Sequence, residues 1–289
     1  MKAILIFPGY RAGVRQLTKD VPLAAAPLLG ECLAVYWLVH LASLGAKEVT
    51  VLANDRPWMV RDTIGNGSRW GLKVRVVEEM HELTVAEARE RHGNGDSEGW
   101  LPAPHDIVLA DHLPGMAGHR LDENHAAWFA AVMAWCDRAV TPDRTGVKEI
   151  APGVRVGRHS VIPPDATLVA PCWIGEKVCI NAGAVIGPDA VVEDRAVIGA
   201  DAEITQSIIG PETMVGEDTE ITDSLALGET LVNWRNGSCL HVPDEYLLCS
   251  LNRSSSDSTE WFRRIAQAVS GSNPPMMPVD RSPVTHPPV

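Results

Sequence analysis

The chain has 289 residues, of which 45% are hydrophobic and 21% are charged, a composition typical of a soluble globular protein. No apolar run approaches the ~20 residues of a membrane-spanning helix, which excludes an integral membrane protein. Residues 1–7 are apolar but end at Pro8, too early for a signal peptide, so we expect a cytoplasmic protein. Six cysteines without a CxxC pair predict free thiols rather than a zinc or disulfide framework.

The net charge of −12 lies mainly in the second half of the chain. Residues 1–149 contain 19 acidic and 16 basic side chains, whereas residues 150–289 contain 18 acidic and 9 basic ones. Phosphate backbones are bound through clustered Lys and Arg. We therefore expect no nucleic acid among the partners of this protein.

The first 80 residues alternate between strand and helix patterns. The continuous apolar run at residues 2–7 predicts a buried strand, short segments rich in Val, Leu and Ile predict further strands, and apolar residues three or four positions apart predict helices. The predicted strands are residues 2–7, 48–52 and 72–77, and the predicted helices are residues 31–44 and 57–64. This order indicates a parallel sheet of the Rossmann-like α/β class, whose ligands bind at the carboxyl ends of the strands. The loop over residues 8–29 is thus the first candidate site.

Residues 1–31 resemble the opening of the sugar-1-phosphate nucleotidyltransferases, whose loop reads approximately AGGxGTRxxPLTxxxPKPLxPVxGK. Residues 65–79 (GNGSRWGLKVRVVEE) resemble a second block of that family. Within residues 1–31, the positions that align with this family pattern are Gly9, Leu17, Thr18, Asp20, Pro22, Pro27 and Gly30. The resemblance implies a shortened nucleotidyltransferase domain and, as nucleotide- or phosphate-binding candidates, Gly9, Arg11, Gly13 and Arg15.

In that family a sugar phosphate attacks the α-phosphate of a nucleoside triphosphate, so cationic groups must offset the developing charge. Here Gly13 stands at the loop arginine position and Leu23 at the loop lysine position, and the base-binding segment expected after residue 79 is absent. Residues 106–111 predict a strand that ends in Asp111, the candidate ligand for Mg²⁺ if the protein is active. Residues 122–138 predict a packing helix. The catalytic residues stay unknown at this stage.

A six-residue repeat occupies the second half of the chain and predicts a β-helix in which each hexad gives a strand and a corner. The repeat resembles that of left-handed parallel β-helices, and fourteen hexads make nearly five turns. After ten consecutive matches, one five-residue step separates Ile204 from Ile209 and predicts a tighter corner there. The repeating aliphatic residues are Ile150, Val156, Ile162, Leu168, Ile174, Ile180, Ile186, Val192, Ile198 and Ile204, then Ile209, Val215, Ile221 and Leu227.

The expected organisation is an α/β domain over residues 1–148, a hexapeptide-repeat β-helix with its cap over 149–252, and a short helix and disordered tail over 253–289. An open coil end invites edge pairing, so we expect the segment after Leu227 to cover it. Trp234 and residues 246–248 are the candidate lids. The tail contains a helical pattern at residues 258–269 and many prolines after it.

Three functions remain open from the sequence. The first is a catalytically inactive nucleotidyltransferase homologue that regulates or scaffolds sugar-nucleotide or cell-surface polysaccharide synthesis. The second is an active enzyme that uses Arg11, Arg15 and Asp111, and the third is an acyltransferase with His159 as the base. We expect a nucleotide or sugar nucleotide as a ligand, and a homo-oligomer or a hetero-oligomer with an active homologue, without a membrane partner.

Overall fold

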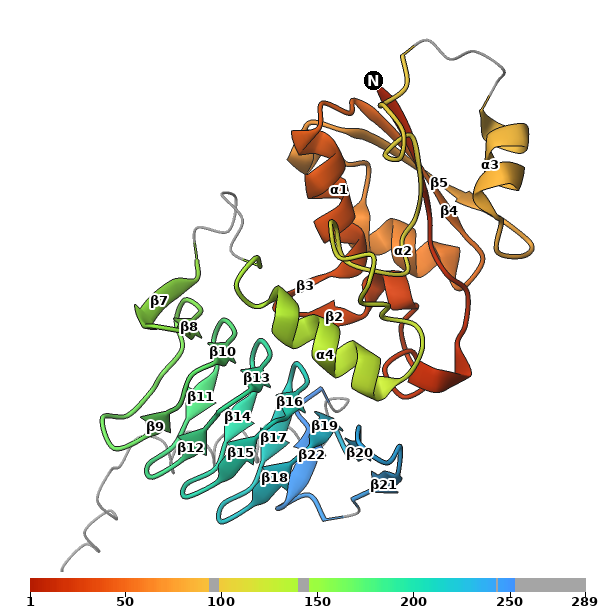
Figure 1. Cartoon of the computed structure of the whole chain (residues 1–289). Coiled ribbons are helices and arrows are strands. Elements are labelled where there is room, and N and C mark those ends of the chain that lie inside the picture. Colours follow the sequence, from red (N-terminus) through yellow and green to blue (C-terminus); the bar gives the residue numbers. More distant parts are fainter. Residues whose placement is uncertain (94–98, 140–145, 243, 253–289) are drawn as a thin grey trace, which may run out of the picture. The chain divides into compact units, whose positions relative to one another are not determined.

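The computed structural model describes residues 1–93, 99–139, 146–242 and 244–252. Residues Met1–Leu251 form one compact unit (Figure 1), and Asn252–Val289 form a second. The predicted helix at 258–269 and the predicted disordered tail at 253–289 lie outside the described residues. Within the described part of the chain, none of the helices combines the length and the apolar character needed to cross a bilayer.

The amino-terminal part contains the four-stranded parallel sheet that the sequence predicts, in the order β5-β4-β1-β6. Its strands are β1 (Lys2–Ile6), β4 (Glu48–Ala53), β5 (Lys73–Glu78) and β6 (Ile107–Leu109), and its helices are α1 (Leu33–Ser43), α2 (Pro57–Ile64) and α3 (Val85–His92). Register pairs Lys2 with Glu48 and Ile4 with Ile107. The arrangement is compatible with a Rossmann-like sheet.

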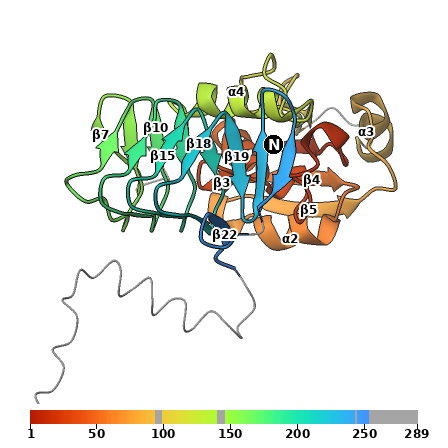
Figure 2. The same ribbon diagram turned by 90° about the horizontal axis from the view of Figure 1, so that it is seen from below.

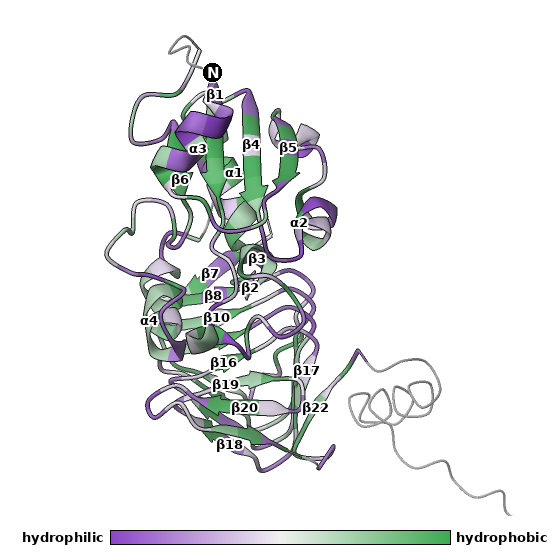
Figure 3. Ribbon diagram, turned by 90° about the vertical axis from the view of Figure 1, so that its right-hand side faces the viewer, coloured by the Kyte–Doolittle hydropathy of each residue, from purple (hydrophilic) through white to green (hydrophobic). Residues whose placement is uncertain are grey.

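Alternate residues of β1 enter two different hydrophobic cores because successive side chains of a strand point to opposite faces. Ala3 and Leu5 belong to the core that contains the residues of α1, and Ile4 and Ile6 belong to a smaller core with Ala88 of α3. The sheet therefore has both faces covered at β1, as the continuous apolar run of this strand requires. Figure 3 shows these strands as hydrophobic and α3 as mostly hydrophilic.

Helix α3 and the short elements of the first loop were not predicted from the sequence. Thr84 and Glu87 form a capping box at the start of α3, in which Thr84 Oγ1 accepts from the Glu87 N–H. The loop after β1 contains two 3₁₀ turns and a small hairpin: η1 (Ala12–Val14), η2 (Leu23–Ala25), β2 (Pro27–Leu28) and β3 (Glu31–Cys32). The 3₁₀ turn η3 (Ser68–Trp70) precedes β5 in the chain, and α4 (His125–Trp135) follows β6.

The repeat forms a β-helix whose coils stack through three parallel sheets (Figure 2). The residues predicted to point inward, Ile174, Ile180, Ile186 and Ile198, are at most 2% exposed and share one core. The strands of the coils are β8 (Val154–Val156), β9 (Thr167–Leu168), β10 (Cys172–Ile174), β11 (Cys179–Ile180), β12 (Val185–Ile186), β13 (Ala190–Val192), β14 (Val197–Ile198), β15 (Glu203–Thr205), β16 (Ile208–Ile209), β17 (Thr213–Val215), β18 (Glu220–Thr222) and β19 (Ser224–Leu227).

The predicted tight corner is present, and a second one lies directly beside it. Only Gln206 and Ser207 separate β15 from β16, and only Asp223 separates β18 from β19. Both Gln206 and Asp223 have positive φ angles, 47° and 52°. The second short step moves the inward position from Leu227 to Ala226, which pairs with Ile209 and is fully buried. The prediction that Leu227 continues the inward series was wrong.

The first hexad was also assigned wrongly. Ile150 lies in β7 (Lys148–Ala151), which pairs antiparallel with β8, and its side chain is 59% exposed. The aliphatic column therefore begins at Val156, and the coil completes four turns before β19. Ile150 was included in the series by chance, because it lies six residues before Val156 although its strand is part of an antiparallel hairpin.

The coil end is covered differently from the expectation. Trp234 is no lid, because its ring stacks on Phe129 of α4 with centroids 4.5 Å apart. Tyr246 and Leu247 are 79% and 46% exposed, and only Leu248 is buried. Added antiparallel strands extend two of the three sheets, namely β20 (Thr230–Asn233) and β21 (Cys239–His241) after β19, and β22 (Leu248–Ser250) beside β17.

Helix α4 lies along one sheet of the coil (Figures 1 and 2). The outward side chains of this sheet are apolar and share a core with Trp128 and Phe129 of α4 and with the α/β part. A buried carboxylate strengthens the connection, because Glu193 accepts hydrogen bonds from the N–H groups of Leu29 at 2.5 Å and Gly30 at 2.6 Å. The outward residues are Trp173, Val191, Ile208, Leu225 and Val232.

Candidate functional site

The candidate site lies at the carboxyl ends of β1 and β6, where the strand order of the sheet reverses. The chain proceeds from β1 outward to β4 and β5, then returns to the other side of β1 to form β6. In open α/β sheets such a switch point leaves a crevice for the ligand. The loop that carries Gly9, Arg11, Gly13 and Arg15 starts at this edge.

A carboxylate from another part of the chain is bound by the first groups of the loop that could bind an anion, the Gly9 N–H and Arg11. Glu82, in the segment between β5 and α3, accepts a hydrogen bond from the Gly9 N–H at 2.9 Å. Its two oxygens also accept from Nη2 of Arg11 at 2.9 and 2.7 Å. A backbone N–H together with an arginine is the combination that commonly holds a phosphate. Here it holds a side chain of the same protein.

Arg11 is engaged on its other side by Asp122, which its Nε reaches at 3.0 Å. The side chain of Asp122 is only 1% exposed and accepts from Arg120 at 2.9–3.0 Å as well. Burial would lower the pKa of Arg11, but the hydrogen bonds and charges of Glu82 and Asp122 outweigh it and raise that pKa. The guanidinium therefore stays charged and held between two carboxylates.

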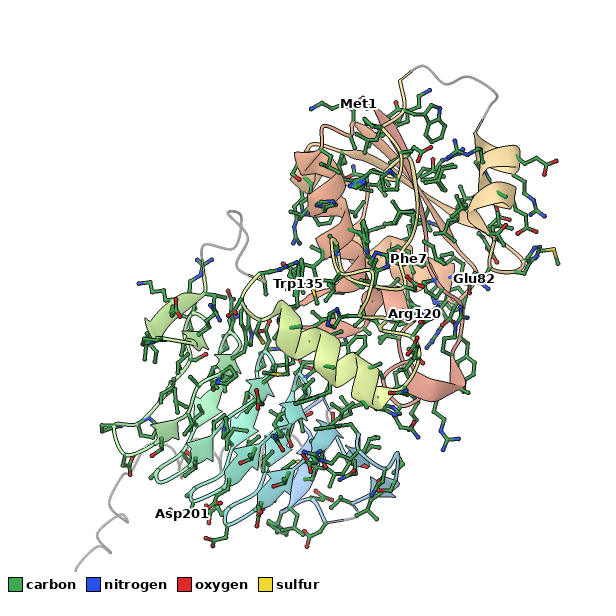
Figure 4. The ribbon with its side chains drawn as sticks, in the orientation of Figure 1. Met1, Phe7, Glu82, Arg120, Trp135 and Asp201 are labelled. Carbon is green, nitrogen blue, oxygen red and sulfur yellow. The ribbon has the colours of Figure 1, made fainter. Side chains whose placement is uncertain are left out.

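The ion network continues to Asp111. Arg120 Nη2 lies 3.4 Å from Asp111 Oδ2, and His112 Nδ1 lies 2.7 Å from Asp111 Oδ1. Burial alone would raise the pKa of Asp111, but the hydrogen bond from His112 and the charges of His112 and Arg120 lower it. Figure 4 labels Glu82 and Arg120 near Phe7, which follows β1. Glu123 lies 3.6 Å from Arg120 Nε, so four carboxylates surround the two guanidinium groups and this edge has no excess positive charge for a polyphosphate.

Gly13 and Arg15 lie outside this network. A Cβ added to Gly13 would come within 1.8 Å of the carbonyl oxygen of Glu123, so the chain backbones pack here without room for a side chain. Arg15 is exposed, and its Nε donates to Gln16 Oε1 at 3.3 Å. Leu23, at the family's lysine position, is 2% exposed within the main core. The structure therefore brings Gly9 and Arg11 together and separates them from Gly13 and Arg15.

The surroundings of Asp111 do not fit Mg²⁺. That ion needs octahedral oxygen ligands and keeps several waters, whereas one carboxylate oxygen of Asp111 faces Arg120 and the other faces a histidine. Across the described residues, no three His, Cys, Asp or Glu side chains are grouped so that they could hold a metal ion. We derive no metal-dependent step for this site.

Sequence reasoning missed Glu82, Arg120 and Asp122, which determine the charge at the carboxyl ends of β1 and β6. Glu82 lies 71 residues from Arg11 along the chain and Asp122 lies 111 away. The sequence did contain one indication of these residues. Each of them follows a predicted strand, in a segment expected at the carboxyl ends of the strands, where ligands bind. Spacing alone does not say which of the many carboxylates reaches the loop.

The comparison with protein families matches the coil. A family model described as bacterial transferase hexapeptide (six repeats) matches residues 171–206, which extend from just before β10 to the first tight corner. Hexapeptide repeats of this kind form left-handed parallel β-helices, in agreement with the stacked coils of three parallel sheets. The match concerns this segment and leaves the α/β part unassigned.

Proposed function

We propose that this chain is a nucleotidyltransferase-like protein without catalytic activity, which serves as a regulator or scaffold in sugar-nucleotide or cell-surface polysaccharide metabolism. The observation that carries the proposal is the ion network at the switch point. Arg11, the cation that follows the first strand, is held by Glu82 and Asp122. A triphosphate would have to displace a carboxylate that the protein itself supplies.

The chemistry of the family explains why this arrangement disfavours turnover. Negative charge grows on the attacked phosphate and on the leaving pyrophosphate, and the protein must stabilise it with fixed cations. The two positions at which the family keeps these cations hold Gly13, packed against a backbone carbonyl, and Leu23, buried in the core. Loss of two such groups costs on the order of several kcal/mol of transition-state stabilisation, or many orders of magnitude in rate.

The test is a pyrophosphate-release assay on the purified full chain with Mg²⁺, each common nucleoside triphosphate and a panel of sugar 1-phosphates. We expect no release above a control without protein. Release that Arg11→Ala or Arg15→Ala abolishes, and that Arg75→Ala leaves intact, would overturn the proposal in favour of an active sugar-1-phosphate nucleotidyltransferase. Arg75 is a suitable control because it is exposed on β5, away from the loop.

The second candidate is an acyltransferase, and the family match to residues 171–206 favours it. His159 is the candidate base and lies exposed at a corner of the first coil with φ of 61°. From β10 to β19, no more than four residues connect consecutive strands, so no inserted loop encloses a substrate there. Thiol release from acetyl coenzyme A that requires an acceptor from a panel of amino sugars and sugar alcohols, and that is lost in His159→Ala, would establish transfer of the acetyl group. Equal rates with and without protein for every acceptor would refute it.

The proposed role also includes a ligand and a partner. A regulator of this lineage would bind a nucleotide or sugar nucleotide without turnover and would assemble with itself or with an active homologue. Light scattering of the purified chain tests self-assembly, and a mass equal to the monomer across micromolar concentrations would leave only the hetero-oligomer. Calorimetric titration with sugar nucleotides tests the ligand, and a flat titration would exclude it.

A further inference from the structure

A cavity of about 370 Å³ lies apart from the ion network and is formed by three segments that are distant in the sequence. It is lined by the first turn after β1, by the start of α4 and by the turn between β20 and β21. None of the residues of the ion network lines it. The amino-terminal part and the last strands of the coil therefore both contribute to one cavity.

Two arginines reach this cavity from different segments. Arg15 comes from the loop, and none of the ion pairs found among the described residues involves it. Arg235 comes from the turn, where its guanidinium pairs with Asp223, donates to Gln206 at 2.9 Å and lies 4.7 Å from the centre of the Trp234 ring. These contacts hold Arg235 in place. With one carboxylate for two guanidinium groups, the cavity keeps one excess positive charge.

The start of α4 adds donors that have no acceptor in the helix. Asn124 caps the helix by accepting from the Ala127 N–H at 2.9 Å, while the N–H groups of His125 and Ala126 belong to the first turn, which leaves such donors unsatisfied. The positive end of the helix dipole favours an anion at this position. Both residues line the cavity.

His125 supplies the second, independent indication of a ligand. The residue lines the cavity and is only 8% exposed, and its Nε2 is buried without a hydrogen-bond partner in the described structure. A buried imidazole nitrogen without a partner is unfavourable, since native structures pair nearly all such atoms. Burial, reinforced by the charge of Arg15, lowers the pKa of His125, so the ring is neutral at pH 7.

Contacts between its walls hold the cavity in shape. Trp234, which precedes Arg235, stacks on Phe129 of α4 with an interplanar angle of 10°, and its Nε1 donates to the Gln206 carbonyl at 2.9 Å. These contacts fix the turn relative to both α4 and the tight corner of the coil. Preformed cavities of a few hundred Å³ with a few converging polar groups suit small molecules rather than proteins or nucleic acids.

We propose that this cavity binds the phosphate group of a small phosphorylated metabolite, held by Arg15, Arg235 and the first N–H groups of α4, with His125 as a hydrogen-bonding neighbour. The site is distinct from the ion network at the carboxyl ends of β1 and β6, and the proposal holds whether or not the protein is catalytically inactive. Because residues of the loop, α4 and the coil all contact the ligand, binding stabilises the junction of the two parts.

The experiment titrates the purified full chain with inorganic phosphate, pyrophosphate and glucose 1-phosphate by calorimetry in metal-free buffer. We expect saturable binding of at least one probe, weakened about tenfold or more by Arg15→Gln, the loss of one charge-assisted contact. Arg235→Gln has the same expected effect, and Arg75→Gln has none. Arg15 makes no ion pair in the described structure, so its variant keeps the wild-type melting temperature without ligand.

Two results would overturn the proposal. One is the absence of saturable binding for all three probes. The other is binding that Arg15→Gln and Arg235→Gln leave unchanged. If Arg11→Gln alone then weakens the binding, the anion lies at the carboxyl ends of β1 and β6. Arg235→Gln also removes contacts to Asp223 and Gln206. If the two variants give different results, the result with Arg15→Gln therefore decides.

Discussion

The buried carboxylate of Glu193 gives the most direct test of how the two parts of the chain are joined. Glu193 is 2% exposed in the coil and accepts from the N–H groups of Leu29 and Gly30, of which Leu29 is fully buried. Glu193→Ala leaves both donors without this acceptor. An unsatisfied buried donor costs about 1–3 kcal/mol, and Gly30 is partly exposed, so we expect a loss of about 2–4 kcal/mol in unfolding free energy.

Urea denaturation followed by tryptophan fluorescence measures this loss, and amide hydrogen exchange at Leu29 and Gly30 should accelerate in the same variant. Glu193→Gln keeps one acceptor and should lose roughly half as much. The control is Glu203→Ala, since Glu203 is exposed on β15 and should change stability by less than about 0.5 kcal/mol. If Glu193→Ala is as stable as that control, the carboxylate does not join the two parts.

Three further predictions address the coil, the loop and the pH dependence. Ile186→Asp should unfold the coil in circular dichroism, because a fully buried residue becomes an unpaired carboxylate at a cost of several kcal/mol, whereas Val161→Asp, at a 56% exposed position, should fold normally. Gly13→Ala should lower the free energy of unfolding in urea by about 1–3 kcal/mol, since the new Cβ meets the Glu123 carbonyl. Gly118→Ala, where a Cβ has open space, should leave it unchanged, and equal stability of the two variants would refute the packing argument. Burial lowers the pKa values of His40 and His125 in the folded state, so the unfolded chain binds more protons. The free energy of unfolding should therefore fall as the pH drops below about 6.5. Urea titrations at about pH 5–8 should show a smaller dependence of this free energy on pH when His40→Gln is combined with His125→Gln.

The β-helix could be predicted from the sequence because a repeat carries the same information many times. One inward aliphatic residue per strand is enough to define the period, and errors appeared only where the repeat ends. Ile150 kept the spacing in an antiparallel strand, and the second short corner moved the inward role from Leu227 to Ala226. A period cannot signal its own end, since the residue beyond the last coil can match it by chance.

A second period in the same sequence would have predicted the covered sheet. Trp173, Val191, Ile208 and Leu225 stand one position before inward residues and recur once per coil, while the equivalent positions of another sheet hold Glu203 and Glu220. Apolar residues on the outer face of one sheet indicate that something packs there. Reading every third hexad separately therefore predicts which side of the coil is covered by the rest of the chain.

The site was less predictable than the fold because charge pairing depends on distance in space alone. The resemblance singled out the loop as a candidate, and the order of the strands indicated the edge of the sheet, but the partner of Arg11 is a glutamate that precedes α3. That residue could not be selected, since many carboxylates follow predicted strands in this acidic chain. The same limitation hides the cavity beside Arg15, whose second arginine comes from a turn more than two hundred residues later. A folded chain thus assigns opposite roles to two arginines of one loop: Arg11 is neutralised from within, and Arg15 is left available to an anion from outside.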